Sequence, residues 1–323
     1  MSLLKSILFV FAFSSFCFGQ SDTLKIKYAL FAETYYLHSA TDVKSPIFYN
    51  HTTVNQPALN LGLVEFSMQK RNWTIQAGMM LGTYVQKNLA SEPDYWKQIY
   101  QLNAQIQVNP TNQLVFGIIP SHIGVESAKN SENDCLSRSY IAENSPYYET
   151  GITWNYLPNP NLSFRLLALT GWQHIGKYKP ALGSQMTFSG STGWKFNSSH
   201  FWGDEGKGFR MFFNHYILLP LSKQFFWTLG GDVGMEAGHW WNGGLTYVTW
   251  KPKANIRMSG RLEYYSDPKA IIMPQAFSDV TQSLTIDVPV MRQIVLRSEL
   301  KHSREFGNEL LFAVVFHKQS SEN

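Results

Sequence analysis

Apolar and polar side chains alternate along almost the whole chain, in stretches of roughly ten residues. The clearest stretch is 101–108, in which Leu, Ala, Ile and Val alternate with four amide side chains. A period of two residues is typical of a β-strand, because successive side chains point to opposite faces of the sheet. The pattern therefore predicts strands that each present one apolar face and one polar face.

Sixteen such strands can be placed along the chain. They are predicted at 25–38, 58–68, 73–86, 95–108, 113–120, 147–156, 162–172, 183–189, 194–202, 209–219, 225–236, 240–250, 255–265, 280–288, 293–302 and 308–317. The pair 183–189 and 194–202 has the weakest alternation. It is open to a second interpretation as one long loop, which would leave fourteen strands.

The connections between these strands alternate between short and long. Seven are short and rich in turn-forming residues: 69–72, 109–112, 157–161, 190–193, 220–224, 251–254 and 289–292. The other eight vary in length, and the longest are 39–57, 121–146 and 266–279. Tight turns at one end and longer loops at the other are typical of a transmembrane barrel, in which an even strand number places both termini at the turn end.

Composition decides between a soluble and a membrane sheet. Asp, Glu, Lys and Arg make up 15% of the chain, against roughly a quarter in soluble domains. The polar strand faces carry mainly Gln, Asn, Ser, Thr and Gly, which suits the lining of a water-filled lumen. The sequence therefore predicts an all-β fold, a transmembrane antiparallel up-and-down β-barrel of about sixteen strands, with its apolar face toward lipid.

The first residues have the features of an export signal. Lys5 precedes the apolar run 7–13, and the small residue Gly19 follows. This pattern predicts a cleaved signal peptide at 1–19 and a barrel at 20–323. A membrane anchor is the alternative, but the run is too short to span about 30 Å of hydrocarbon. Cleavage would lower the formal net charge from +4 to +3, an excess too small to indicate nucleic-acid binding. It would also leave one cysteine, which excludes a disulfide within the mature chain.

Aromatic residues, 15% of the chain, gather near the predicted strand ends. Rings at both lipid interfaces are typical of membrane barrels, whereas a soluble core would place them at mid-strand. At the turn ends the rings are Trp73, Tyr156, Trp194, Phe225, Trp227 and Trp250. At the loop ends they are Tyr35, Tyr84, Tyr95, Trp96, Tyr148, Trp172, Trp202, Trp240, Trp241 and Tyr264.

Charged residues within the strands fall on the polar face. An Arg or Lys facing lipid at mid-depth costs about 2–4 kcal/mol, so these side chains are expected to face the lumen. The pore-lining candidates are Arg165, Arg210, Asp232, Arg257, Arg261, Glu263, Arg297 and Glu299. They could form a constriction that sorts solutes by charge, or pair across neighbouring strands and stiffen the wall. Their mixed signs argue against strong selectivity for anions or cations.

The connection 121–146 is long and polar, and it is the best candidate for a loop folded into the barrel. Its constriction candidates are Glu126, Asp134, Arg138 and Glu143. Cys135 lies in the same segment, where its polar neighbours favour exposure. No basic partner that would make the thiol nucleophilic is identified.

Motifs for catalysis are absent from the sequence. The nine histidines are dispersed, no H-E-x-x-H zinc motif occurs, and no G-x-S-x-G nucleophile elbow occurs. We therefore predict neither an enzyme nor a cofactor or metal site.

Several short segments resemble the most distinctive part of the putative beta-barrel porin-2 family, OmpL-like outer-membrane proteins common in Bacteroidetes. They are His122-Ile123-Gly124-Val125-Glu126, Asn133, Ser137-Arg138-Ser139 and Ser145-Pro146-Tyr147-Tyr148-Glu149-Thr150-Gly151. Strand pattern and length extend the resemblance over 24–316. It implies an outer-membrane barrel with a diffusion-channel role, but no defined solute or binding residues. The chain departs from the usual barrel pattern at its end, where seven residues follow Phe316.

Together these features favour a porin-like channel in the bacterial outer membrane, for passive diffusion of small hydrophilic solutes through a lumen narrowed by 121–146. Its expected partners are outer-membrane lipid and those solutes, without nucleic acid, and association into a homo-oligomer is left open. An active transporter is disfavoured, because such barrels have about 22 strands and a plug domain. The alternative is a closed barrel with an anchoring, adhesion or partner-binding role, for which the apolar run 270–273 is the only hint.

Overall fold

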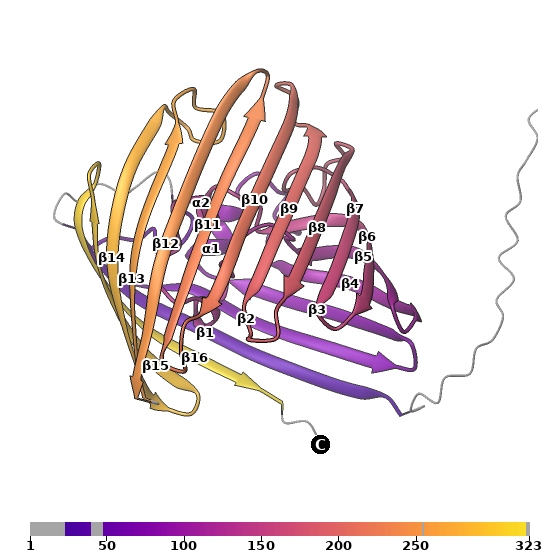
Figure 1. Cartoon of the computed structure of the whole chain (residues 1–323), viewed down its shortest axis with the longest axis horizontal. Helices are drawn as coiled ribbons and strands as arrows, with labels where there is room; N and C mark the ends of the chain where they lie inside the picture. The colour runs from indigo at the N-terminus through magenta and orange to yellow at the C-terminus, as the bar shows by residue number, and fades with distance from the viewer. Residues whose placement is uncertain (1–22, 40–47, 254, 321–323) are drawn as a thin grey trace, which may run out of the picture.

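The computed structural model describes residues 23–39, 48–253 and 255–320. Within these residues sixteen antiparallel strands close into one barrel (Figure 1). Each strand pairs with its neighbours in sequence, and β1 (Lys25–Ser39) pairs with β16 (Gly307–Gln319) to close the sheet. The predicted up-and-down barrel is confirmed. Residues 1–19, the predicted signal peptide, lie outside the described part.

The remaining elements follow in chain order. The other strands are β2 (Pro57–Lys70), β3 (Trp73–Leu81), β4 (Ile99–Asn109), β5 (Asn112–Pro120), β6 (Tyr148–Asn159), β7 (Leu162–Leu169), β8 (Ala181–Ser189), β9 (Lys195–Asp204), β10 (Phe209–Pro220), β11 (Phe225–Glu236), β12 (His239–Lys253), β13 (Ile256–Asp267), β14 (Phe277–Met291) and β15 (Ile294–Ser303). The short helices are α1 (Thr83–Asn88), η1 (Asn130–Glu132) and α2 (Tyr140–Glu143). Strands β8 and β9 pair along their whole length, so the fourteen-strand alternative is wrong.

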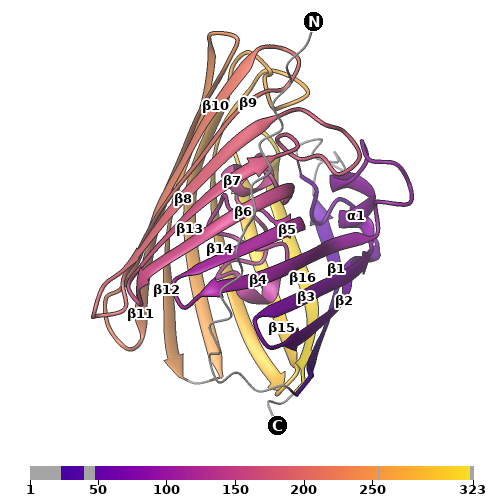
Figure 2. The same ribbon diagram turned by 90° about the vertical axis from the view of Figure 1, so that its right-hand side faces the viewer.

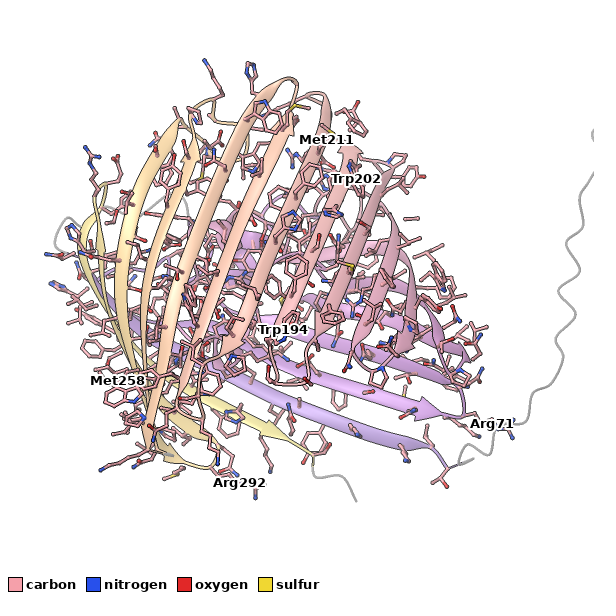
Figure 3. The ribbon with its side chains drawn as sticks, viewed as in Figure 1. Arg71, Trp194, Trp202, Met211, Met258 and Arg292 are labelled. Atoms are coloured by element: carbon pink, nitrogen blue, oxygen red, sulfur yellow. The ribbon has the colours of Figure 1, made fainter. Side chains whose placement is uncertain are left out.

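The two faces of the wall follow the alternation in the sequence. In β14, for example, Thr281 and Thr285 are buried inside the barrel, whereas Val280 and Leu284 are exposed on the outer face. Figure 3 shows side chains projecting along the wall, with Arg71, Trp194 and Arg292 at the end that carries the short turns. We call this the turn end and the opposite rim the loop end. Among the described residues, no helix is long and apolar enough to cross a membrane.

Several strands end earlier or begin later than the sequence predicts. Strand β3 ends at Leu81 because Gly82 has a φ of 127°, and a Cβ there would lie 2.3 Å from the Asn60 carbonyl oxygen. Only glycine adopts this conformation without strain, and the chain then turns into α1. Strand β4 begins at Ile99, which leaves Tyr95 and Trp96 in the preceding loop. Strand β7 ends at Leu169, shortly before Gly171 with a φ of 138°.

The predicted aromatic girdles hold for some rings and fail for others. Outward-facing, exposed rings include Trp73, Phe225, Trp240, Trp250 and Tyr264. The prediction is wrong for five rings that pack inside the barrel: Tyr35, Tyr84, Tyr148, Trp172 and Trp241. Position near a strand end indicates depth in the membrane but not the face of the wall, and these rings fall on the lumen side.

Trp241 shows how an inward ring is accommodated. Its indole lies over Gly234 of the neighbouring strand, where any Cβ would come within 2.0 Å of the ring. The guanidinium of Arg210 lies 5.8 Å from the indole centroid and 4.8 Å from that of Trp172. Trp241 and Trp172 therefore belong to an apolar core inside the loop end of the barrel, to which Arg210 adds cation–π contacts.

The apolar run 270–273 also faces inward. Met273 is buried, and Ile271 and Ile272 pack against the same interior core. The carboxylate of Asp267 accepts hydrogen bonds from the backbone N–H groups of all three residues, at 2.8 to 2.9 Å. Met273 is therefore shielded from a partner, and Ile271 and Ile272 are only partly exposed, which weakens the hint that this run offered for partner binding.

Candidate functional site

The segment 121–146 leaves β5, crosses the interior of the barrel and returns to β6, which pairs with β5 (Figure 2). It carries η1 and α2, which contact β16 and strands β12 and β13 respectively. We call it the inner loop. An irregular backbone inside a barrel needs hydrogen-bond partners for its N–H and C=O groups, and these partners identify what holds the loop in place.

Carboxylates on the wall of β13 to β15 bind the N–H groups of the inner loop. Glu299 accepts from the backbone N–H groups of Leu136 and Ser137 at 2.8 and 2.9 Å. Glu263 accepts from the N–H of Tyr140 at 2.6 Å. The hydroxyl of the same tyrosine donates to Asp279 at 2.7 Å. Such bonds to ionised acceptors are stronger than those between neutral groups, so this wall fixes the loop tightly.

Arginines on the same wall bind the carbonyl groups of the loop. Arg261 donates to the carbonyl of Ser137 at 2.7 Å. Arg257 and Arg297 both donate to the carbonyl of Asn133, at 2.9 and 3.0 Å. The wall therefore satisfies both donors and acceptors of the loop, with carboxylates and guanidinium groups interspersed along three strands.

Arg261 is the centre of this network. Its guanidinium lies 3.5 Å from Glu126 of the loop, 3.5 Å from Glu263 and 3.6 Å from Glu299. The four side chains are 3% exposed or less. Three carboxylates so deeply buried would repel one another without the cation, so Arg261 is the group on which the attachment of the loop depends most.

The first residues of the inner loop are held by the opposite side of the barrel. His122 Nδ1 lies 2.8 Å from Glu149 of β6, and Nε2 lies 2.9 Å from the carbonyl of His200 in β9. Both ring nitrogens therefore lie within hydrogen-bond distance of an acceptor. The carbonyl of His122 accepts from Gln185 and Ser199, at 2.6 and 2.8 Å. The inner loop therefore crosses the lumen with anchors on both sides.

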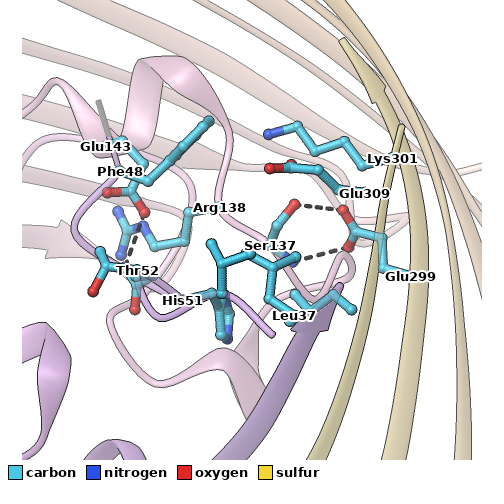
Figure 4. A pocket seen from close by; sticks show the side chains of 13 residues that line it. Leu37, Phe48, His51, Thr52, Ser137, Arg138, Glu143, Glu299, Lys301 and Glu309 are labelled. Atoms are coloured by element: carbon cyan, nitrogen blue, oxygen red, sulfur yellow. Dashed lines mark hydrogen bonds between the residues drawn. The ribbon is translucent and has the colours of Figure 1, made fainter. Parts of the chain in front are cut away.

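A second inward segment, residues 48–56, lies between β1 and the inner loop. His51 Nε2 is 2.5 Å from Glu33 of β1, and Asn130 of the inner loop donates to the same carboxylate at 3.0 Å. Glu143 accepts from the N–H of Tyr49 at 2.7 Å. A cavity of about 40 Å³ remains between the two segments (Figure 4). It has room for only a few waters, so it is not an open passage through this side of the barrel.

The wall of β3 to β9 is lined differently. Its lumen side carries a chain of hydrogen-bonded amides, such as Gln105 to Gln76 and Asn155 to Gln113, both at 2.8 Å. Gln76, Gln105 and Gln113 are half-buried, so they retain contact with water. Only Arg165 of β7 and Lys195 of β9 add charge to the lumen side of these seven strands within the turn-end half. The amide wall thus keeps water-accessible surface inside the barrel.

The structure divides the sequence-predicted site residues into a buried group and a group that remains partly or fully exposed. Six of the eight pore-lining candidates are at most 7% exposed: Arg210, Asp232, Arg261, Glu263, Arg297 and Glu299. Arg165 is exposed, and the side chain of Arg257 is 23% exposed. Among the loop candidates, Asp134 is 28% exposed, and Arg138 and Glu143 are buried. The predicted part of all these residues in solute sorting stays a prediction.

The partners of these residues explain the difference. Arg210 donates from Nε to Glu236 at 2.8 Å, and Asp232 accepts from Asn214 at 2.5 Å. The guanidinium of Arg138 lies 4.1 Å above the ring of Tyr147. Sequence reasoning missed four anchors of the loop: Asp279, Glu33, the pair His122 and Glu149, and Asn214, which accepts from the N–H of Gly124. The period-two pattern could have found Asp279 and Glu33, because both fall on the lumen side of their strands.

The position of Cys135 corrects the expectation that its thiol is exposed. Its side chain is 1% exposed and packs in the interior core, although its sequence neighbours are polar. The polar neighbours bond to the charged wall, which leaves the thiol facing apolar groups. Burial raises the pKa of the Cys135 thiol well above its ordinary value, so the thiol stays protonated and shielded.

Labelling of Cys135 gives a direct test of the loop position. We expect a maleimide reagent to modify the folded, signal-free protein slowly up to pH 9, because a raised pKa keeps the reactive thiolate scarce. Mass spectrometry would follow the time course. The matched control is Ser91→Cys combined with Cys135→Ser, because residue 91 is exposed. Labelling of Cys135 as fast as this control would show that the inner loop does not lie where the structure places it.

Comparisons with known proteins agree with this architecture. A family model described as "Putative beta-barrel porin-2, OmpL-like" matches residues 25–320. Among curated proteins, none matches significantly. The outer-membrane channel DcaP of Acinetobacter baumannii has a TM-score of 0.61 at 9% identity, over 91% of this chain and 97% of that one. OmpT of Vibrio cholerae, in its trimer form, has a TM-score of 0.61 at 7% identity, over 92% and 99%. A mutant of the Rh. blastica porin has a TM-score of 0.56 at 9% identity, over 92% and 100%.

Proposed function

Because this chain belongs to the putative beta-barrel porin-2, OmpL-like family and is therefore a bacterial outer-membrane barrel, we propose that it is a channel for passive diffusion of small hydrophilic solutes. The observation that carries the proposal is the amide wall of β3 to β9, where half-buried side chains such as Gln76, Gln105 and Gln113 remain accessible to water on the lumen side. Uncharged amides can exchange hydrogen bonds with water and with polar solutes as these pass.

The inner loop supplies the narrowing in this proposal. Arg257 and Asp134, both partly exposed, form an ion pair of 3.3 Å at its edge, and Arg165 is exposed on the wall of β7. These groups would meet a passing solute, whereas Arg261 and its carboxylates would hold the loop in position. Diffusion down a gradient needs neither catalysis nor a cofactor nor ATP, and we propose no enzymatic role.

The proposal extends to the ends of the chain and to its surroundings. We propose that 1–19 is removed on export and that 20–323 forms the barrel. The exposed apolar side chains of the outer face, such as Leu284 and Val280, suit contact with lipid. One of the structural neighbours is described as a trimer, which supports assembly into homo-oligomers.

Single-channel conductance tests the proposed function. The signal-free protein would be refolded and inserted into a planar bilayer, and a heat-modifiability gel would establish that the barrel has folded. We expect stable, stepwise conductance, because the amides on the lumen side of β3 to β9 remain accessible to water. A folded barrel that never conducts would contradict the proposal and favour the anchoring, adhesion or partner-binding alternative.

A further inference from the structure

A cavity of about 610 Å³ lies inside the turn end of the barrel, beneath the tip of the inner loop at Ser131. Three lysines line it: Lys223 from the turn between β10 and β11, and Lys251 and Lys253 from the end of β12. Arg257 of β13 also lines it. We call this cavity the lysine vestibule. In outer-membrane barrels the short turns face the periplasm, so the vestibule is the periplasmic mouth of the lumen.

The positive charge of the lysine vestibule is not neutralised. Its one carboxylate, Asp287, is shared by Arg257 and Arg297, each of which donates to it at 2.7 Å. Within the described ranges, Lys223, Lys251 and Lys253 form no ion pair, and all three are exposed. Their side chains therefore line the same cavity without a counter-charge from the protein, and the ammonium of Lys251 lies 4.4 Å from the centroid of the Phe226 ring.

Two further cations extend the positive surface along the wall. Lys195 is the first residue of β9 and faces the lumen, close enough to Arg165 for the two charges to interact. Two of the accessible carboxylates of the lumen are already paired: Glu65 and Glu132 lie 3.1 and 2.9 Å from the ammonium of Lys129. From the sequence alone every lumen charge has equal weight, and charges of both signs predict a lumen without a dominant sign of electrostatic potential. Burial withdraws most of the carboxylates, so the charges that remain in water are mainly positive.

We propose that the lysine vestibule binds small solutes carrying two or more negative charges on carboxylate or phosphate oxygens, and that the channel passes such anions in preference to cations. This inference rests on the proposed channel function and names the class of solute. Clustered charges beside a low-dielectric wall raise the local concentration of counter-ions, and rings of cationic side chains select anions in pores.

Ion selectivity and block by a polyanion test the inference. The protein would be inserted into a planar bilayer under a KCl gradient, with inorganic pyrophosphate added to one side and then to the other. We expect a reversal potential that favours chloride, and block from the periplasmic side at the lower concentration. In the variant Lys223→Gln, Lys251→Gln, Lys253→Gln, the half-blocking concentration should rise about tenfold, or about 1.4 kcal/mol, and the chloride preference should shrink.

A matched control separates the vestibule from the overall charge of the rim. Lys25→Gln, Lys70→Gln and Lys318→Gln together remove the same charge at the turn end, on strands that do not line the vestibule. This control should keep the wild-type block. Equal weakening in both triple variants would overturn the inference.

The outcomes also distinguish this inference from the channel function. Conductance without chloride preference or pyrophosphate block would overturn the inference and leave the channel intact. If the folded barrel does not conduct, the proposed function fails. Calorimetry with pyrophosphate on the refolded protein in detergent then tests whether the vestibule binds such anions. Heat release that the vestibule variant loses would support the site, and an absence of heat would overturn it.

Discussion

Arg261→Met is expected to lower the free energy of unfolding by about 3–5 kcal/mol, the usual cost of removing one partner from a buried ion network. The guanidinium lies within 3.6 Å of Glu126, Glu263 and Glu299, and it also binds the carbonyl of Ser137 at 2.7 Å. Without it, three buried carboxylates repel one another. The loop can relieve this repulsion only by moving away from the wall.

Two measurements follow the loss of Arg261. Guanidinium titration monitored by tryptophan fluorescence would give the stability, and single-channel recording should show a larger conductance because the loop leaves part of the lumen. Arg261→Lys keeps the charge but not the forked geometry, and we expect an intermediate effect. It also provides a folded variant if the methionine variant does not refold.

The exposed arginine of the turn between β14 and β15 is the control. Arg292→Met changes the same side chain at a water-facing site (Figure 3), and we expect a change within about 0.5 kcal/mol. If Arg261→Met were as stable as this control and conducted like the wild type, Arg261 would not anchor the inner loop.

Replacing residues 121–147 by Asn-Gly is expected to raise the single-channel conductance several-fold, the largest functional change that we predict. Pro120 and Tyr148 are paired across β5 and β6, and a two-residue Asn-Gly turn suits such a hairpin. The ladder of sixteen strands is left intact, so the barrel should still fold and shift on a heat-modifiability gel. The wall charges that held the loop would then be hydrated by the open lumen.

Deletion of Lys177 and Tyr178 gives the control for loop shortening. Both residues are exposed in the connection between β7 and β8, so conductance should stay at the wild-type value. A folded barrel without the inner loop that still conducts like the wild type would show that this loop is not the constriction.

The sequence by itself determined the fold, because the information is local. Period-two alternation defines a strand and its two faces wherever it occurs, and turn-forming residues define where one strand ends. The weakly alternating pair that became β8 and β9 was recovered by this rule. The prediction of strand ends was less accurate where the backbone conformation of a single residue ends the strand, as at Gly82.

The candidate site depended on information that the sequence holds only at long range. Parity placed Arg261 and Glu299 on the lumen side correctly but could not show that the inner loop covers them. That loop is held by residues more than 120 positions away, such as Glu263 for Tyr140 and Glu299 for Ser137. Tertiary structure alone therefore decided which lumen charges are buried as anchors and which remain in water, because burial depends on what packs against a face and not on the face alone.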